Sequence, residues 1–173
     1  EYNHFFYVLI LSSTLIALIG FLDDIYDLNP FFRTILHISA ILMLISSNYK
    51  ILDIGIINFT EYPIFIRNLF TTFCVLILIN SINFLDGEDG LASSNVILSI
   101  AIIVFYSSFY NSILTFEFIY LLIGLLFIFL FFNLQIFNLP KIFLGDSGSN
   151  LCGFLLGWLL IYFTSPQISA FPP

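Results

Sequence analysis

The chain has 173 residues, of which 60% are hydrophobic, 19% aromatic and only 9% charged, and its formal net charge is −7. Soluble domains carry roughly 25% charged residues, so this composition excludes an ordinary water-soluble fold. The acidic balance also speaks against nucleic acid as a partner. Several apolar runs of roughly 17 to 23 residues could each cross a hydrocarbon core of about 30 Å, and we therefore expect an integral membrane protein.

Six apolar runs, separated by Gly, Pro and polar residues, are the candidate helices. They are too long for barrel strands and lack the alternation of apolar and polar residues that such strands show. A helix, in contrast, satisfies its own backbone polar groups inside a bilayer. We therefore predict an all-α, polytopic transmembrane helical bundle that forms a single domain over residues 1–173. The predicted helices are Phe5–Phe21, Phe31–Ser47, Ile64–Leu85, Leu91–Tyr110, Thr115–Phe137 and Ser149–Thr164.

Two shorter features complete this organisation. The polar segment between Asn48 and Pro63 is predicted to form a small surface hairpin. The chain begins at Glu1 rather than Met and ends at Pro173 directly after a spanning run, so we expect it to be part of a longer protein, truncated at both ends.

Counting membrane crossings places three acidic segments on one face of the membrane. They are Asp23–Asp27, Asp86–Gly90 and Lys141–Ser149, which together hold seven of the eleven acidic residues. The four basic residues divide evenly between the two faces, so the bias of basic loops toward the cytoplasm does not orient the protein.

The first acidic segment follows directly on the first apolar run. If that helix continues, Asp23 and Asp27 lie four residues apart on one face, where their like charges repel unless a cation or water separates them. A hard cation would be a natural partner. An acidic loop that caps the next helix, with Asp27 or Asn29 ahead of Pro30, explains the segment equally well.

The second acidic segment is preceded by a polar stripe. Asn80, Asn83 and Asp86 recur every three residues, so they lie close to one another along a helix. Such groups are costly inside a membrane and usually line a cavity filled with water or ligand. The glycines that follow allow Asp89 to lie beside Asp86. A polar helix end with a glycine stop would explain the glycines but not the amides.

The third acidic segment opens the last helix with Gly-Asp-Ser-Gly-Ser. Small residues at a helix N-terminus leave N–H groups that can bind phosphate, while Asp146 can hold a metal and Lys141 can neutralise a phosphate. Taken alone, however, a plain N-cap at Ser147 or Ser149 explains this segment better.

Together, the three segments offer the groups that phosphoryl chemistry on a lipid requires. Mg²⁺ prefers oxygen ligands and bridges substrate phosphates to one or two carboxylates. Because the acids are not accompanied by a Cys or His cluster, we expect Mg²⁺, with Mn²⁺ as an alternative, rather than zinc.

These segments resemble those of the polyprenyl-phosphate N-acetylhexosamine-1-phosphate transferases, glycosyltransferase family 4. The resemblance covers roughly residues 5 to 165, with Glu88 in place of the usual apolar residue between two Asp-Gly pairs. The matching segments are Asp23-Asp24 with Asp27 for the paired-aspartate loop, Asn80–Ala92 for Asn-x-x-Asn-x-x-Asp-Gly-x-Asp-Gly-Leu-Ala, and Phe143–Ser149 for the Gly-Asp-Ser/Thr-Gly-Ser loop.

The resemblance implies Mg²⁺-dependent transfer of a sugar-1-phosphate from a UDP-N-acetylhexosamine to a polyprenyl (undecaprenyl) phosphate, with release of UMP. This would be the initiating membrane step of cell-wall or surface polysaccharide synthesis. The resemblance also implies a bacterial inner membrane with the acidic segments in the cytoplasm, and it leaves a homodimer open. The implied site residues are Asp23, Asp24, Asp86 and Asp89 in catalysis, Asp146 and Asp24 at the metal, and Asn80, Asn83, Lys141 and Asp27 in substrate binding.

Two other classes of protein fit this pattern less well. The CDP-alcohol phosphatidyltransferases carry Ala-Arg shortly after an Asp-Gly pair, whereas no arginine occurs in Leu91–Ser94. A cation transporter would place its acids near the bilayer midplane in interrupted helices, whereas these acids lie at predicted helix ends.

Overall fold

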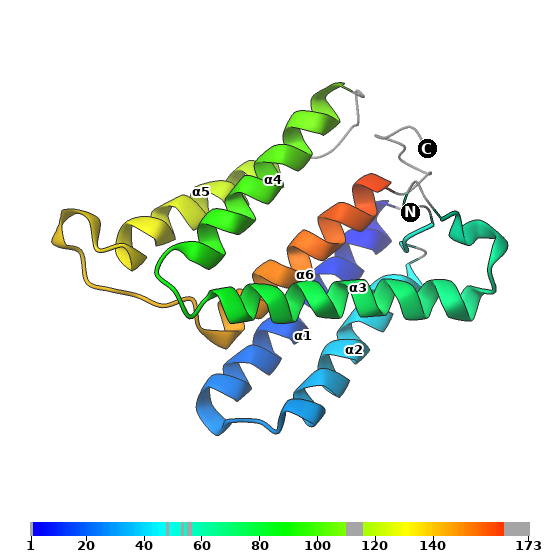
Figure 1. Cartoon of the computed structure of the whole chain (residues 1–173), viewed down its shortest axis with the longest axis horizontal. Coiled ribbons are helices and arrows are strands. Elements are labelled where there is room, and N and C mark those ends of the chain that lie inside the picture. The colour runs from blue at the N-terminus through cyan, green and yellow to red at the C-terminus, as the bar shows by residue number, and fades with distance from the viewer. Residues whose placement is uncertain (1, 48, 53, 55–56, 110–115, 165–173) are drawn as a thin grey trace.

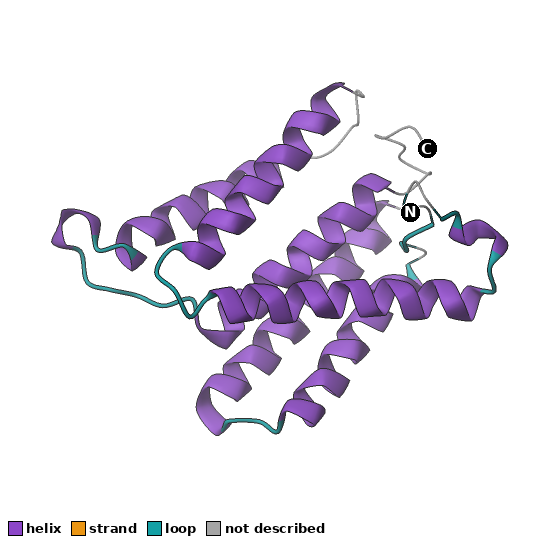
Figure 2. Ribbon diagram, in the orientation of Figure 1, coloured by secondary structure: helices purple, strands orange, loops and turns teal. Residues whose placement is uncertain are grey.

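The computed structural model describes residues 2–47, 49–52, 54, 57–109 and 116–164, and within these ranges it contains helices and no β-strand (Figure 2). The α-helical bundle predicted from the sequence is confirmed. Its elements are α1 (Tyr2–Tyr26), α2 (Pro30–Ser46), the 3-10 turn η1 (Phe59–Glu61), α3 (Ile64–Leu85), α4 (Leu91–Phe109), α5 (Phe116–Asn133), the 3-10 turn η2 (Ile136–Asn138) and α6 (Gly145–Thr164).

Helix α6 lies at the centre of the bundle. It packs against α1, α3 and α4, and every residue from Cys152 to Leu159 is buried. Helix α3 crosses α6 and α2 obliquely (Figure 1). The crossing is close because Gly153 of α6 has no side chain: a Cβ there would lie 2.6 Å from the Ile79 Cα of α3. The buried apolar residues of α6 therefore form the core that holds the other helices in place.

Helices α4 and α5 form an antiparallel pair at one side of this core (Figure 1). The pair contacts the core mainly through α4, which packs on α6. The first residues of α4 and the last residues of α5 lie at the same end of the pair, next to the start of α6. Two loops that carry predicted site residues therefore extend from this end.

Large apolar side chains are exposed along every long helix, including Phe65 and Phe84 of α3. Soluble monomers seldom expose contiguous apolar patches larger than a few hundred Å². The helical segments Tyr7–Tyr26 and Ile64–Leu85 are long and apolar enough to cross a membrane, and three shorter helices are also apolar. That all six helices span a bilayer remains a prediction.

The predicted helix boundaries agree with the structure for α2 to within one residue and for α3 at both ends. The fourth predicted helix also begins where α4 does, and its predicted end, Tyr110, lies outside the described residues. The predicted C-terminal end of the first helix, Phe21, was wrong. Helix α1 continues to Tyr26, so Asp23 and Asp24 lie on its last turn rather than in a loop.

The fifth and sixth predicted helices also need correction. Helix α5 ends at Asn133 instead of Phe137, because the backbone turns sharply after it: φ is 53° at Gln135 and 60° at Phe137, which no α-helix accommodates. Helix α6 begins at Gly145, earlier than the predicted Ser149, because its first N–H groups find acceptors outside the helix.

The predicted hairpin between Asn48 and Pro63 is described only in part. The Phe59 N–H donates to the Leu52 carbonyl at 2.7 Å, as a hairpin pairing requires. Residues 48, 53, 55 and 56 lie outside the described part of the chain.

Candidate active site

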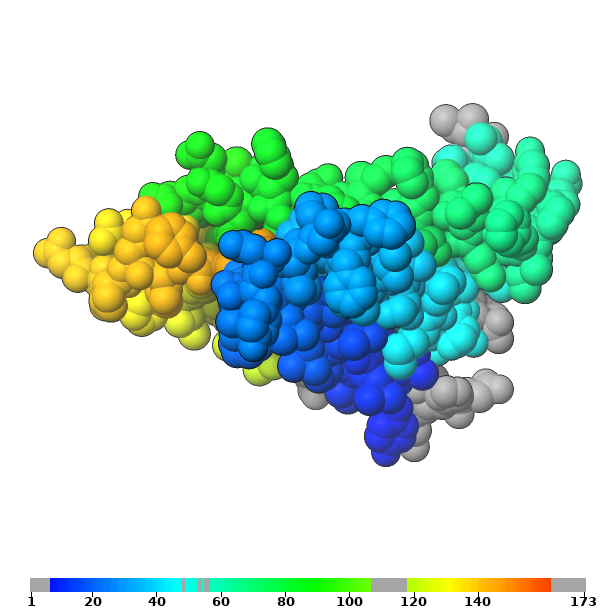
Figure 3. Space-filling view, turned by 90° about the horizontal axis from the view of Figure 1, so that it is seen from below, coloured from blue at the N-terminus to red at the C-terminus, as the bar shows by residue number. Residues whose placement is uncertain are grey.

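The three acidic segments meet at one end of the bundle, although they are far apart in the sequence. The Asp24 carboxylate of α1 accepts hydrogen bonds from the backbone N–H groups of Asp146 and Ser147, at 2.9 and 3.2 Å. The Asn83 amide of α3 donates to the Asp146 carboxylate and, at 2.9 Å, to the Ser149 hydroxyl. In Figure 3 the end of α1 and the segment leading into α6 lie side by side. These contacts bring together the segments that the count of crossings placed on one face.

This meeting point is built from side chains of four helices and the residue that follows α3. We name it the acidic centre. Its members are Asp23 and Asp24 of α1, Arg33 of α2, Asn83 of α3, Asp86 directly after α3, and Asp146 of α6.

The N-terminus of α6 is capped by carboxylates that come from elsewhere in the chain. Besides the two bonds to Asp24, the Gly145 N–H bonds to Asp86. Carboxylates are favourable here because the first N–H groups of a helix carry partial positive charge. The prediction that these N–H groups are free to bind phosphate was therefore wrong.

The serines of this turn are not its caps either. The Ser147 hydroxyl donates to the Ala17 carbonyl of α1 at 2.9 Å, and the Ser149 hydroxyl donates to the Gly145 carbonyl at 2.8 Å. Gly145 has φ of +66°, and a Cβ there would lie 3.0 Å from an Asp24 oxygen. A glycine is thus required for Asp24 to reach the helix end.

Asp23 is the most deeply buried acid of the centre, with 4% of its surface exposed. It accepts hydrogen bonds from the Arg33 guanidinium and, at 2.9 Å, from the Leu28 N–H. Arg33 also lies 3.7 Å from an Asp146 oxygen. A buried carboxylate needs such a partner, because an unpaired buried charge is strongly destabilising.

Sequence reasoning missed Arg33 as a site residue. The signal that could have found it is its place in the first turn of the helix that follows the paired aspartates, where it is the only cation near them in the sequence.

The turn between α1 and α2 supports the capping interpretation over a cation between Asp23 and Asp27. The Asn29 side chain accepts the Phe31 N–H at 2.9 Å and Pro30 begins α2. Asp27 is exposed, with φ of 47°, and in the described part of the chain its side chain makes no hydrogen bond or ion pair. Its role in substrate binding stays a prediction.

Asp86 has an unusual proton affinity. Burial raises its pKa to about 6, the bond from the Gly145 N–H opposes this, and the nearby Asp146 and Asp24 carboxylates raise it further. Negative charge thus accumulates at the acidic centre, where four carboxylates face a single guanidinium. An additional cation would relieve the repulsion.

The acidic centre fits a hard divalent cation by the chemistry of its donors, which are carboxylate and amide oxygens. Within the described residues, no three His, Cys, Asp or Glu side chains form a ready group of ligands. Mg²⁺ needs no such group, because it usually keeps several waters and takes one or two carboxylates together with substrate phosphates.

A second contact joins the loop after α3 to the segment before α6. Lys141 Nζ lies 2.7 Å from an Asp89 oxygen, and it also lies 5.0 Å from the centre of the Phe143 ring. Both charged side chains are partly exposed. Asp89 and Lys141, both predicted site residues, are therefore brought together at the same end of the bundle.

Asn133, the last residue of α5, was also missed by sequence reasoning. It is buried and bonds to both of the segments that carry the ion pair. A polar residue at the end of a very apolar helix was the available signal, but its partners are 43 and 9 residues away and could not be read from the pattern.

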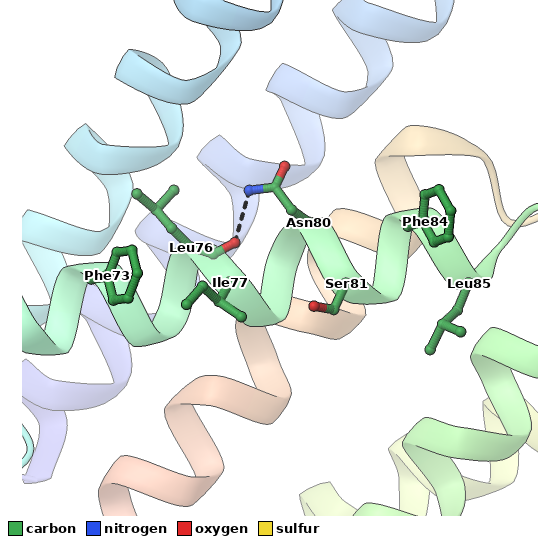
Figure 4. Close-up of a pocket in the computed structure, with 7 residues that line it drawn as sticks. All are labelled: Phe73, Leu76, Ile77, Asn80, Ser81, Phe84 and Leu85. Atoms are coloured by element: carbon green, nitrogen blue, oxygen red, sulfur yellow. Dashed lines mark hydrogen bonds between the residues drawn. The ribbon is translucent and has the colours of Figure 1, made fainter.

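Asn80 is not brought to the acidic centre. Its amide donates to the Leu76 carbonyl of its own helix at 2.8 Å, and its side chain lies in an open groove of about 590 Å³ along α3 (Figure 4). The predicted polar stripe therefore divides, with Asn83 facing α6 and Asn80 facing the groove. A substrate-binding role for Asn80 stays a prediction. The groove is lined by Phe73, Leu76, Ile77, Asn80, Ser81, Phe84 and Leu85.

Comparison with known proteins gives a consistent result. Residues 6–164 match the model of a family described as glycosyl transferase family 4. The chain is 26% identical, over 86% of its length, to a probable undecaprenyl-phosphate N-acetylglucosaminyl 1-phosphate transferase of Bacillus subtilis. It is 33% identical, over 86% of its length, to a putative UDP-N-acetylglucosamine–dolichyl-phosphate N-acetylglucosaminephosphotransferase of Saccharolobus solfataricus.

A third relative is the phospho-N-acetylmuramoyl-pentapeptide-transferase of Nautilia profundicola, at 26% identity over 99% of the chain. The chain covers 41%, 46% and 56% of these three proteins, respectively. It therefore spans about half the length of the relatives that it matches.

Proposed function

The chain belongs to glycosyl transferase family 4, and from this premise we propose that the protein transfers a sugar-1-phosphate from a UDP-sugar to a polyprenyl phosphate and releases UMP. The relatives named for N-acetylglucosamine favour an N-acetylhexosamine as the sugar. The observation that carries the proposal is the acidic centre, in which Asp24, Asn83 and Asp146 meet at the start of α6.

The reaction joins two phosphates, so the site must manage negative charge. A phosphate oxygen of the lipid attacks the β-phosphorus of the UDP-sugar, and the bond from that phosphorus to the oxygen shared with the α-phosphate breaks. Asp23 orients the lipid phosphate or acts as its base, while Arg33 beside it offsets the charge that develops. Asp24 supports this arrangement because both its oxygens are fixed by α6.

We further propose that Asp146 and Asp24 hold Mg²⁺, or alternatively Mn²⁺. A bound divalent cation would offset the charge of the diphosphate as UMP departs. Asn83 fixes one oxygen of Asp146 and leaves the other toward Arg33. Asp86 and Asp89 would complete the surroundings of the donor, with Lys141 available to its phosphates.

The position of the centre suits a reaction between a lipid and a soluble nucleotide. The acids lie at helix ends, where a bilayer meets water, rather than midway along the helices. A polyprenyl phosphate would arrive from the membrane and a UDP-sugar from solution. We propose that this face lies in the cytoplasm and that the membrane is the bacterial inner membrane.

The direct test measures UMP release by the purified protein in detergent. UMP should form from UDP-N-acetylglucosamine only when a polyprenyl phosphate and Mg²⁺ are both present, and EDTA should abolish its formation. Formation of UMP without the lipid, or turnover that is insensitive to EDTA, would contradict the proposal.

A further inference from the structure

We propose that Asn133 is a positioning residue that holds Asp89 and Lys141 in the geometry that the UDP-sugar requires. The inference rests on the proposed function for the role of the ion pair. We call the two hydrogen bonds of the Asn133 side chain the clamp, and these contacts do not depend on that function.

Asn133 uses both ends of its side-chain amide. Its oxygen accepts the Gly90 N–H at 2.6 Å, and its nitrogen donates to the Ile142 carbonyl at 2.9 Å. Gly90 directly follows Asp89, and Ile142 directly follows Lys141. One amide therefore ties together the two backbone segments at the positions next to the ion pair.

The burial of these groups differs sharply. Asn133 is 4% exposed, whereas the side chains of Asp89 and Lys141 are 52% and 32% exposed. An exposed ion pair on flexible segments holds its geometry poorly, because two long side chains must be ordered in water. A buried hydrogen bond is costly to break, because it would leave its polar groups without partners. The buried amide thus determines where the exposed pair lies.

Gly90 is adapted to this clamp. Its φ is +73°, and a Cβ there would lie 2.9 Å from the Leu134 side chain at the end of α5. The loop after α3 therefore rests directly on α5, with its N–H turned to Asn133. An ordinary helix cap would bond within its own helix, whereas Asn133 reaches 43 residues back and 9 residues forward.

The kinetic test compares Asn133→Leu, which removes both bonds but keeps a side chain branched at Cγ, with Asn133→Asp, which keeps the acceptor for Gly90 but loses the donor. Asn95→Leu on the exposed surface of α4 is the matched control. We expect Asn133→Leu to raise the KM for UDP-N-acetylglucosamine about tenfold, with a smaller rise for Asn133→Asp. The KM for the polyprenyl phosphate should not change in any of the three variants.

A merely structural role predicts a different pattern. It would lower the yield of folded protein or kcat while leaving the KM for the UDP-sugar as in the wild type, and this result would overturn the proposal. Asn133→Asp keeps the test decisive if Asn133→Leu does not fold.

A second readout does not depend on turnover. A carbodiimide joins neighbouring carboxylates and amines, so it should link Asp89 to Lys141 in the wild type, as quantified by mass spectrometry of peptides. The yield should drop severalfold in Asn133→Leu and stay unchanged in Asn95→Leu. An unchanged yield in Asn133→Leu would overturn the clamp even in an active enzyme. A wild type that makes this link but releases no UMP would instead overturn the proposed function.

Discussion

The acidic centre and the Asp89–Lys141 pair lie at the same end of the bundle but are stabilised in different ways. The centre draws side chains from several helices into a partly buried network, in which acids outnumber Arg33 and fix the start of α6. The pair is a single exposed contact whose backbone is held by Asn133. Similar charged groups therefore contribute to stability in one region and mainly to geometry in the other.

The largest expected effect comes from removing the cation of the acidic centre. Arg33→Met should lower the free energy of unfolding by about 3–5 kcal/mol, because it leaves Asp23 buried without a charged partner. Thermal unfolding in detergent measures this loss. The double variant Arg33→Met/Asp23→Asn should recover much of this loss. If Arg33→Met alone is as stable as the wild type, the acidic centre contributes no more to stability than the exposed pair does.

Next in size is the loss of charge at Asp146. Asp146→Asn should reduce UMP release by on the order of a hundredfold or more, because metal stabilisation of phosphoryl charge is worth several kcal/mol. The control is Glu61→Gln, an exposed carboxylate in η1, which lies beyond the other ends of α2 and α3. If Asp146→Asn turns over UDP-sugar at nearly the wild-type rate at saturating UDP-sugar and Mg²⁺, Asp146 does not bind the metal and serves only in the first turn of α6.

A smaller effect should appear in the dependence of stability on pH. Folding raises the pKa of Asp86 to about 6, so the folded protein binds this proton more tightly than the unfolded chain does. Asp86 should therefore lower the stability of the metal-free protein as pH rises from about 4 to 6. Melting temperatures of the wild type and Asp86→Asn across this range should diverge as pH rises, with the variant more stable; parallel curves would contradict the assignment.

The smallest effect is expected at the exposed pair. Lys141→Met should change the free energy of unfolding by less than about 1 kcal/mol, since exposed ion pairs contribute little. The same variant should still weaken binding of the UDP-sugar, measured by titration calorimetry with UMP as the probe. A large loss of stability would place this pair in the same energetic class as the acidic centre.

Local sequence patterns predicted much of this architecture. Helix α3 was predicted at both ends because Pro63 precedes its apolar run and the Asp-Gly pairs follow it. The meeting of the acidic segments followed from counting helices, since alternate crossings return the chain to the same face.

The errors arose where a distant residue decides the local structure. Helix α6 begins at Gly145 because Asp24, 122 residues earlier than Asp146, accepts its first N–H groups. For Asp23, the sequence left open a cation shared with Asp27 or an acidic capping loop, whereas the charged partner of Asp23 is Arg33 on the next helix. Asn133 was not predicted as a site residue, because an amide at a helix end does not indicate which distant backbone groups it bonds. Such contacts are properties of the packed molecule and leave no periodic signal.

The glycine at position 20 has a mechanical consequence. A Cβ there would lie 2.4 Å from the Ser147 Cα, so α1 and α6 touch backbone to backbone directly beside Asp24. Gly153 brings α6 similarly close to α3 on another side, where a Cβ would lie 2.6 Å from the Ile79 Cα. Because no side chain separates the backbones at these two points, the direct contacts of α6 with α1 and α3 set the position of the acidic centre, and a side chain larger than hydrogen at either glycine would push these helices apart.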